Sequence, residues 1–167
     1  MLRLIERLLQ RLPVGLHVAG LRLAHAVRRR WWKLSGGAVR GCRVLVLDKR
    51  SRVLLIRHSY GSGEWMLPGG GLSRREDPLA GARREVGEEC AIALEQAVML
   101  GRTDDPQSQH ETHLVAGWTG DEPRPDGREV IAAAFFASDA LPARCHPDLG
   151  ERLARWITAA KAARRAD

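Results

Sequence analysis

The chain has 167 residues, and 44% of them are hydrophobic. This length and composition suffice for one domain whose core needs neither disulfides nor a structural metal. The formal net charge of +7 is typical of a nucleic-acid-binding protein. All of this excess lies in residues 1–33, which hold eight basic side chains and one acidic side chain, because the rest of the chain holds 19 basic and 19 acidic side chains. A neutral remainder offers little charge for a phosphate backbone, so nucleic acid is not an expected partner.

Residues 1–36 form a basic amphipathic arm in which we expect two helices. Apolar residues recur at helical spacing up to Leu12, Pro13 interrupts the run, and a second run continues to a tryptophan pair. Such helices pack on their own domain or on a second subunit in a homodimer. The alternatives are peripheral contact of residues 1–33 with an anionic membrane and an organelle transit peptide. We favour packing, because apolar faces of this length usually bind protein.

The three cysteines, Cys42, Cys90 and Cys145, lie far apart in apolar stretches. Their odd number and wide spacing favour reduced thiols in the core over disulfides or metal ligands. The chain also contains no apolar run long enough to span a bilayer. These features predict a cytoplasmic protein.

Short apolar runs bounded by turn residues predict five strands after the arm. The strands cover residues 43–48, 52–58, 97–100, 113–118 and 129–136. The sequence from His110 to His113 reads H-E-T-H, which lacks the spacing of a zinc-binding helix, so we expect plain strand there. A terminal helix is expected over residues 147–165, with its large apolar side chains on one face.

A glycine turn precedes the most distinctive helix of the chain. Gly69, Gly70 and Gly71 permit positive φ angles and a close approach of backbone to a ligand. Asp77 is a preferred N-cap residue, and Pro78 suits the first helical position, where its missing N–H costs nothing. The signals predict a helix that starts at Pro78.

Three glutamates, Glu85, Glu88 and Glu89, follow at spacing i, i+3 and i+4 on this helix. That spacing places them on one face, where like charges repel by about 0.2–0.5 kcal/mol per pair. The apolar residues of the helix fall on the other side, so we expect a buried face and a solvent-exposed acidic face. A hard divalent cation would relieve the repulsion, and Mg²⁺ is the natural candidate for a set of oxygen ligands.

The surrounding residues complete a known pattern, G-x5-E-x7-R-E-U-x-E-E-x-G-U, where U is a bulky apolar residue. The chain matches it with Gly70, Glu76, Arg84, Glu85, Val86, Glu88, Glu89 and Ile92. It departs at Ala91, which replaces the second glycine, a position concerned with how the helix ends. This segment resembles the signature of the Nudix hydrolases. The W-x-L-P-G-G lead-in at residues 65–70 and the strand at 129–136 extend the resemblance over roughly residues 38–160.

The resemblance implies an α/β Nudix fold, in which a mixed β-sheet is sandwiched between helices, here with an N-terminal helical extension. It divides the chain into the arm, residues 1–36, and a Nudix hydrolase domain, residues 37–167. Trp65 and Leu67 of the lead-in are expected to pack beside the site.

The resemblance also implies an activity, the Mg²⁺-dependent hydrolysis of a pyrophosphate bond by water attack on phosphorus, with Mn²⁺ as a substitute metal. The expected metal ligands are Glu85, Glu88, Glu89 and the Gly70 carbonyl. Glu89 would be the shared ligand and water-orienting base, and Arg84, four residues before Glu88, would orient that glutamate. The turn at Gly69, Gly70 and Gly71 would bind substrate.

A further carboxylate from outside the signature often completes such sites. Its distance from the aromatic pair at 135–136 makes Glu129 the matching residue, and an exposed acid at the start of a strand is the equal alternative. The second glutamate of that region is replaced by Ala132, so no role is assigned to that position.

The substrate is expected to be a small nucleoside diphosphate linked to another moiety. ADP-ribose-like compounds come first, oxidised or ordinary nucleoside triphosphates second and RNA 5′ ends third. The alternative is a catalytically silent Nudix-fold binding or regulatory module. Such modules usually lose carboxylates of the signature, whereas this chain keeps Glu85, Glu88 and Glu89.

Overall fold

The structure is a computed structural model that describes residues 39–73, 75–104 and 110–166. The predicted arm, residues 1–36, lies outside these residues. Its two helices and the domain boundary behind it therefore stay predictions.

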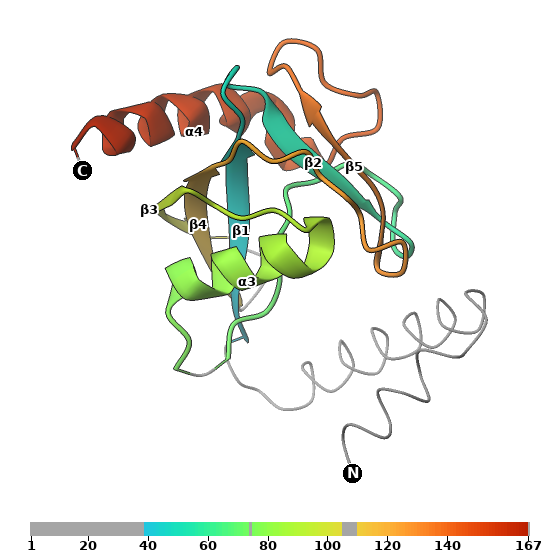
Figure 1. The fold of residues 1–167 in the computed structure, drawn as a ribbon, viewed down its shortest axis with the longest axis horizontal. Helices are drawn as coiled ribbons and strands as arrows, with labels where there is room; N and C mark the ends of the chain where they lie inside the picture. Colours follow the sequence, from blue (N-terminus) through green and yellow to red (C-terminus); the bar gives the residue numbers. More distant parts are fainter. Residues whose placement is uncertain (1–38, 74, 105–109, 167) are drawn as a thin grey trace. The chain divides into compact units, whose positions relative to one another are not determined.

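A mixed five-stranded sheet forms the centre of the domain (Figure 1). Its strands are β1 (Val39–Leu47), β2 (Val53–His58), β3 (Gln96–Asp104), β4 (His110–Trp118) and β5 (Val130–Phe136). They lie in the order β3-β4-β1-β2-β5, and only the central pair β1 and β4 is parallel among these strands. All five strands were expected, and the H-E-T-H segment is confirmed as part of β4.

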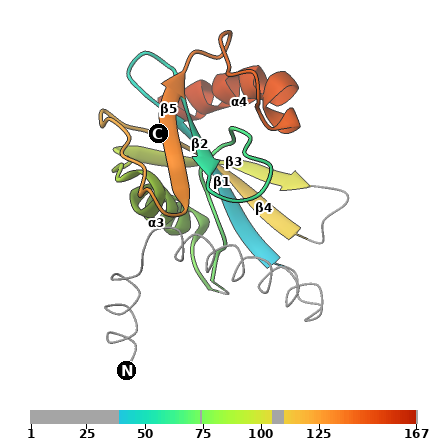
Figure 2. The same ribbon diagram turned by 90° about the vertical axis from the view of Figure 1, so that its right-hand side faces the viewer.

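One helix packs on each face of the sheet, as Figures 1 and 2 show. Helix α3 (Pro78–Cys90) covers one face, and helix α4 (Pro147–Ala166) covers the other. The predicted α/β architecture, a mixed sheet sandwiched between helices, is thereby confirmed for the part of the chain that the structure describes. Neither helix in these residues is long and apolar enough to cross a membrane.

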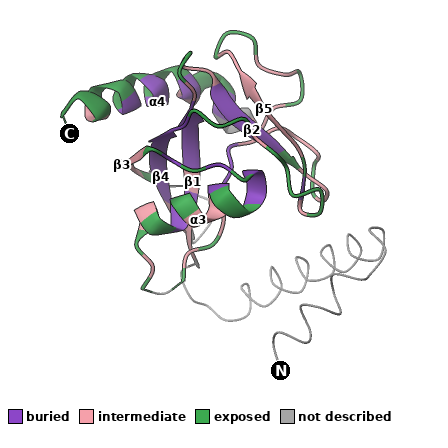
Figure 3. Ribbon diagram, viewed as in Figure 1, coloured by how far each residue is buried: buried purple, intermediate pink, exposed green. Residues whose placement is uncertain are grey.

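Alternation along the central strand separates the two cores. Val44 and Val46 of β1 are fully buried under α3, whereas Leu45 and Leu47 are fully buried under α4. Figure 3 shows buried segments of β1 and β2 between the helices, and Val44–Leu47 and Val53–Ile56 are the buried runs. The apolar face predicted for the terminal helix is buried in the second core through Leu149, Leu153, Trp156 and Ile157.

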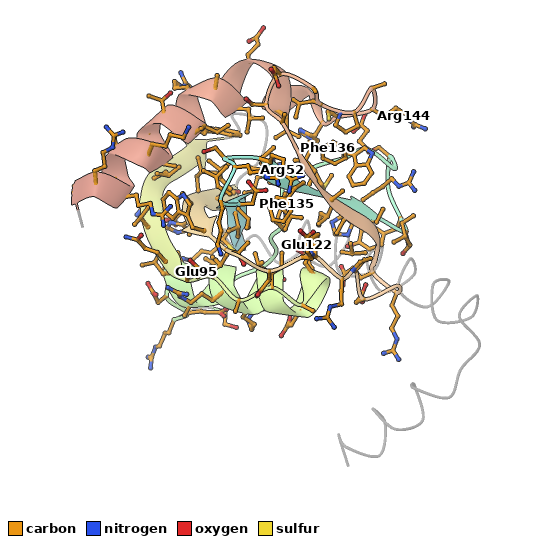
Figure 4. All side chains as sticks on the ribbon, turned by 45° about the horizontal axis from the view of Figure 1, so that its top comes forward. Arg52, Glu95, Glu122, Phe135, Phe136 and Arg144 are labelled. Carbon is orange, nitrogen blue, oxygen red and sulfur yellow. The ribbon has the colours of Figure 1, made fainter. Side chains whose placement is uncertain are left out.

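The edge strand β5 repeats this alternation with two adjacent aromatics, both labelled in Figure 4. Phe135 packs on the α3 side beneath the Arg52 guanidinium, which lies 5.7 Å from the ring centroid. Phe136 packs on the α4 side against Trp65 in an edge-to-face pair with centroids 5.0 Å apart. Leu67 is buried in the same core, so both lead-in residues pack on the α4 side of the sheet.

Helix α3 begins and ends as its sequence indicates. Asp77 caps the start by accepting a hydrogen bond of 3.1 Å from the Ala80 N–H. Ala91 closes the end in the left-handed conformation, with φ 54° and its N–H bonded to the Gly87 carbonyl. The departure from the signature at Ala91 therefore falls on a helix C-cap, where glycine is favoured because it has no Cβ.

The cysteines are free, as predicted, and two of them are buried. Burial raises the pKa of the Cys42 thiol to about 11 and that of Cys90 to about 12. Both thiols are therefore protonated at neutral pH and pack as small apolar side chains.

Candidate active site

Backbone hydrogen bonds connect the glycine turn before α3 to β1. The Val44 N–H donates to the Pro68 carbonyl and the Cys42 N–H donates to the Gly70 carbonyl, both at 2.9 Å. Gly69 has φ +143°, and a Cβ on it would lie 2.2 Å from the Cys42 carbonyl oxygen. Only glycine fits there, and this close approach aims the Gly69 N–H at helix α3.

Glu89 Oε2 accepts a hydrogen bond from that N–H, with 3.0 Å between the oxygen and the nitrogen. Its residue is only 7% exposed, so the prediction of a uniformly solvent-exposed acidic face is wrong for Glu89. Helical spacing shows which residues share a face but not which other segments cover that face. Here the turn at Gly69 covers it at Glu89. Burial, opposed by the Gly69 hydrogen bond and reinforced by neighbouring carboxylates, raises the pKa of Glu89 to about 8.

Glu85 lies one turn earlier against the same glycine turn. Its carboxylate occupies the space beside Gly70, where a Cβ would lie 2.6 Å from Oε1. Its side chain is 14% exposed, and burial raises its pKa although the Arg84 guanidinium opposes the shift. The Gly70 carbonyl, a predicted metal ligand, uses one lone pair on the Cys42 N–H and keeps a second.

Arg84 joins the acidic residues of the signature. Its guanidinium lies 2.8 Å from Glu76, 2.8 Å from Glu85 and 3.3 Å from Glu88. Hydrogen bonds from Arg84, then from the Ser73 N–H, lower the pKa of Glu76 to about 2. Arg84 thus contacts Glu88 as expected and also fixes the loop before α3, while the Glu88 side chain stays 64% exposed.

Glu129 approaches this cluster from the start of β5. Asp126 accepts hydrogen bonds from the N–H groups of Arg128, Glu129 and Val130, which shapes the turn into the strand. The charge of Glu129 contributes to the raised pKa values of both Glu85 and Glu89. The half-buried Glu129 therefore lies near enough to interact electrostatically with Glu85 and Glu89, although 40 residues of sequence separate it from Glu89.

Two aromatic residues at the end of β2 line the same site and carry no signal in the sequence signature. His58 Nε2 lies 4.0 Å from Glu89 Oε1, and the imidazole stacks on Tyr60 with centroids 4.9 Å apart and 22° between the planes. The Tyr60 hydroxyl donates a hydrogen bond to Glu129 Oε1. Asp126 was also missed, although the Asp126-Gly127 dipeptide is a turn signal directly before Glu129.

The donor set suits a hard divalent cation. Within the described residues, no three carboxylate, imidazole or thiolate groups converge closely enough to hold a metal ion as they stand. Glu88 is turned toward Arg84, so it must rotate to join Glu89. The fit is one of chemistry. The buried Glu89 interacts electrostatically with three other carboxylates, those of Glu85, Glu129 and Asp126, and Mg²⁺ prefers oxygen ligands with negative charge.

The chain is similar to known proteins in sequence and in fold. Residues 37–157 match the NUDIX domain model. A putative 8-oxo-dGTP diphosphatase of Bacillus subtilis is 30% identical over 103 residues, which cover 61% of this chain and 68% of that protein. Diphosphoinositol polyphosphate phosphohydrolase 2 of Rattus norvegicus is 31% identical over 67 residues, which cover 40% of this chain and 37% of that protein. The chain thus matches little more than a third of the length of this second relative.

A solved structure shares the fold as well. The crystal structure of a MutT NUDIX hydrolase from Burkholderia pseudomallei superimposes with a TM-score of 0.58 at 27% identity, and the match covers 71% of this chain and 97% of that one. The match of the domain model over most of the chain, the B. subtilis relative and the shared fold lead to one conclusion. The chain belongs to the Nudix hydrolase family.

Proposed function

We propose that this protein is a Mg²⁺-dependent pyrophosphohydrolase that cleaves a pyrophosphate bond in a nucleoside diphosphate linked to another moiety. The observation that carries the proposal is the burial of Glu89 of α3. Its carboxylate accepts a hydrogen bond from Gly69 in the glycine turn, and other carboxylates interact with it electrostatically. A pyrophosphate is itself negatively charged, so a site this acidic suits it only when cations lie between the two. Membership of the family supports the same reaction class.

In this proposal Glu85, Glu88, Glu89 and the Gly70 carbonyl hold Mg²⁺, for which Mn²⁺ substitutes. The metal supplies neutralisation of the phosphate charge and acidification of water. Glu89 would be the shared ligand that orients the attacking water and accepts its proton, at the position set by its hydrogen bond from the Gly69 N–H. Arg84 orients Glu85 and Glu88 through its planar guanidinium, and Glu129 adds a carboxylate from the turn before β5.

The backbone of the turn at Gly69, Gly70 and Gly71 is proposed to contact the substrate phosphates. Gly71 has open space where a Cβ would lie, and Gly70 approaches Glu85 too closely for any side chain. A substrate can therefore approach the backbone closely at Gly71. The N–H of Gly69 is committed to Glu89, so its part is to position that carboxylate.

The proposed substrate is an ADP-ribose-like compound or a nucleoside triphosphate. The longer of the two alignments reported above is to a protein named as a putative 8-oxo-dGTP diphosphatase, which favours a nucleotide. The other relative is named for diphosphoinositol polyphosphate, and the aligned part covers 37% of it. Both names refer to a diphosphate group. The proposed metal ligands and the glycine turn would act on such a group.

A screen of Mg²⁺-supplemented reactions tests the proposal. The panel holds ADP-ribose, nucleoside triphosphates with 8-oxo-dGTP, a diphosphoinositol polyphosphate and a 5′-triphosphorylated RNA, with products identified by mass spectrometry in H₂¹⁸O. We expect one phosphate product to carry ¹⁸O, and Glu89→Gln to abolish turnover while the fold is kept. Glu151→Gln, an exposed acid on α4, is the matched control. Nucleotide binding without turnover by the wild type would instead support the silent binding module.

For residues 1–33 we propose packing on the domain or on a second subunit. Co-sedimentation with anionic liposomes compares the full chain with one that starts at Ser35. Equal pelleting supports packing, and stronger pelleting by the full chain supports the peripheral membrane contact. Light scattering on the same two chains distinguishes a homodimer from a monomer.

A further inference from the structure

The segment between β2 and the glycine turn forms a closed loop beside the acidic cluster. Ile56 and Met66 exchange two backbone hydrogen bonds, of 2.9 and 3.0 Å, across its base. Gly61 and Gly63 provide its positive φ angles of 81° and 67°. The loop is therefore anchored at both ends, and Tyr60, on its first turn, has a defined position rather than that of a free surface aromatic.

Tyr60 connects two elements of the site. Its hydroxyl donates to Glu129 Oε1, and its ring stacks on His58. The imidazole of His58 lies 4.0 Å from Glu89, with its side chain 12% exposed. One aromatic pair thus contacts the two carboxylates, Glu89 from α3 and Glu129 from the β5 turn.

The main chain of Glu129 is held independently of its side chain. The Ser59 N–H donates to the Glu129 carbonyl at 2.9 Å, and Asp126 accepts the Glu129 N–H at 3.2 Å. These bonds bring the residue next to the end of β2 but leave the direction of its carboxylate open. Glu129 also repels Glu85 and Glu89, as their raised pKa values indicate. Without a donor, the carboxylate would turn toward solvent.

We propose that Tyr60 is a positioning residue whose hydroxyl holds the Glu129 carboxylate at the metal site. The inference rests on the proposed function, because it gives Glu129 a place among the carboxylates that bind Mg²⁺. The stacking on His58 fixes the plane of the phenol, and the hydroxyl then sets the Glu129 carboxylate. Donors of this kind behind metal-binding carboxylates typically contribute 10- to 100-fold to metal affinity or activity.

The first test measures metal binding without turnover. Mn²⁺ is titrated into the metal-free full-length protein and free Mn²⁺ is followed by electron paramagnetic resonance. We expect Tyr60→Phe, which keeps the ring and its stacking, to weaken binding about 10-fold or more, as Glu129→Gln does. Ser62→Ala, an exposed residue of the same loop whose hydroxyl bonds to Glu64, is the matched control and should bind as wild type. Wild-type affinity in Tyr60→Phe overturns the inference.

The second test is a double-mutant cycle in kcat. If Tyr60 acts through Glu129, Tyr60→Phe combined with Glu129→Gln is no slower than Glu129→Gln alone, because the hydroxyl then has no carboxylate to hold. If the double variant instead loses kcat by the product of the two single losses, the inference is overturned. Turnover by the wild type would in that case still support the proposed function. A wild type that hydrolyses nothing on the panel overturns the proposed function, and the Mn²⁺ titration then still decides whether Tyr60 holds Glu129. A thermal melt checks that each variant is folded.

Discussion

The Gly69 N–H donates a 3.0 Å hydrogen bond to Glu89 Oε2 across 20 residues of sequence. It links the turn that is fastened to β1 with the buried carboxylate of α3. The position of the Glu89 carboxylate is therefore coupled to the backbone of the sheet, and disturbing either partner should affect both stability and the proposed activity.

Gly69→Ala should destabilise the protein strongly. The new Cβ would lie 2.2 Å from the Cys42 carbonyl oxygen, in a conformation with φ +143°. Strain of this kind costs roughly 1–3 kcal/mol for the backbone alone, with the overlap added to it. Urea denaturation measures the free energy of unfolding. Gly71→Ala is the control, since its Cβ meets no atom within 4 Å, and equal stability of the two variants would contradict the explanation.

Glu89 should make the metal-free protein less stable as the pH rises. Its pKa of about 8 in the folded chain exceeds the ordinary 4.5, so the folded state holds a proton that the unfolded state releases between these values. The stabilisation is complete below about pH 4.5 and is lost as the pH rises through about 8. Urea titrations in EDTA from pH 5 to 8.5 should show this decline in wild type and a flatter profile in Glu89→Gln. Parallel profiles would refute the assignment.

Metal binding should ionise the Glu89 carboxyl group, which is largely protonated at pH 7 in the metal-free protein. Mg²⁺ requires the ionised carboxylate, so binding to wild type at pH 7 should release protons, and the affinity should rise with pH up to about 8. Calorimetry in buffers of different ionisation enthalpy measures the proton release. Glu89→Gln should release fewer protons on any binding that persists, and equal release would contradict the prediction.

Arg84→Met should lower kcat/KM about 10- to 100-fold, because Glu85 and Glu88 lose the donors that orient them. Arg84→Lys keeps the charge but not the planar fork, so it should recover only part of the loss. Arg155→Met, exposed on α4, is the matched control. Full activity in Arg84→Lys would show that charge alone is sufficient.

Ala91→Gly should stabilise the protein by about 0.5–1 kcal/mol. Ala91 has φ 54°, a left-handed conformation that costs a non-glycine residue roughly 1–2 kcal/mol, and the greater freedom of glycine in the unfolded chain offsets part of the gain. Thermal unfolding measures the change. Ala80→Gly, in an exposed part of the same helix, should destabilise by about 0.5–1 kcal/mol, and a shared sign for the two variants would disprove the C-cap explanation.

The sequence alone determined the local features of this protein. Asp77 and Pro78 located the start of α3, and the alternation of apolar residues located the strands, because caps, turns and periodicity depend on neighbours within a few residues. The spacing of Glu85, Glu88 and Glu89 placed them on one helix and suggested a metal site, whose ligands stay a prediction.

Only the tertiary structure decided which of these carboxylates is buried and what surrounds it. Glu89 is covered while Glu88 remains exposed, although both were expected on the solvent face. The Tyr60 hydroxyl and Glu129 meet across 69 residues of sequence, and no local pattern encodes that contact. The physical reason is that burial and pKa depend on segments brought together by the order of strands in the sheet, whereas helical spacing records only the direction in which each side chain leaves its own helix.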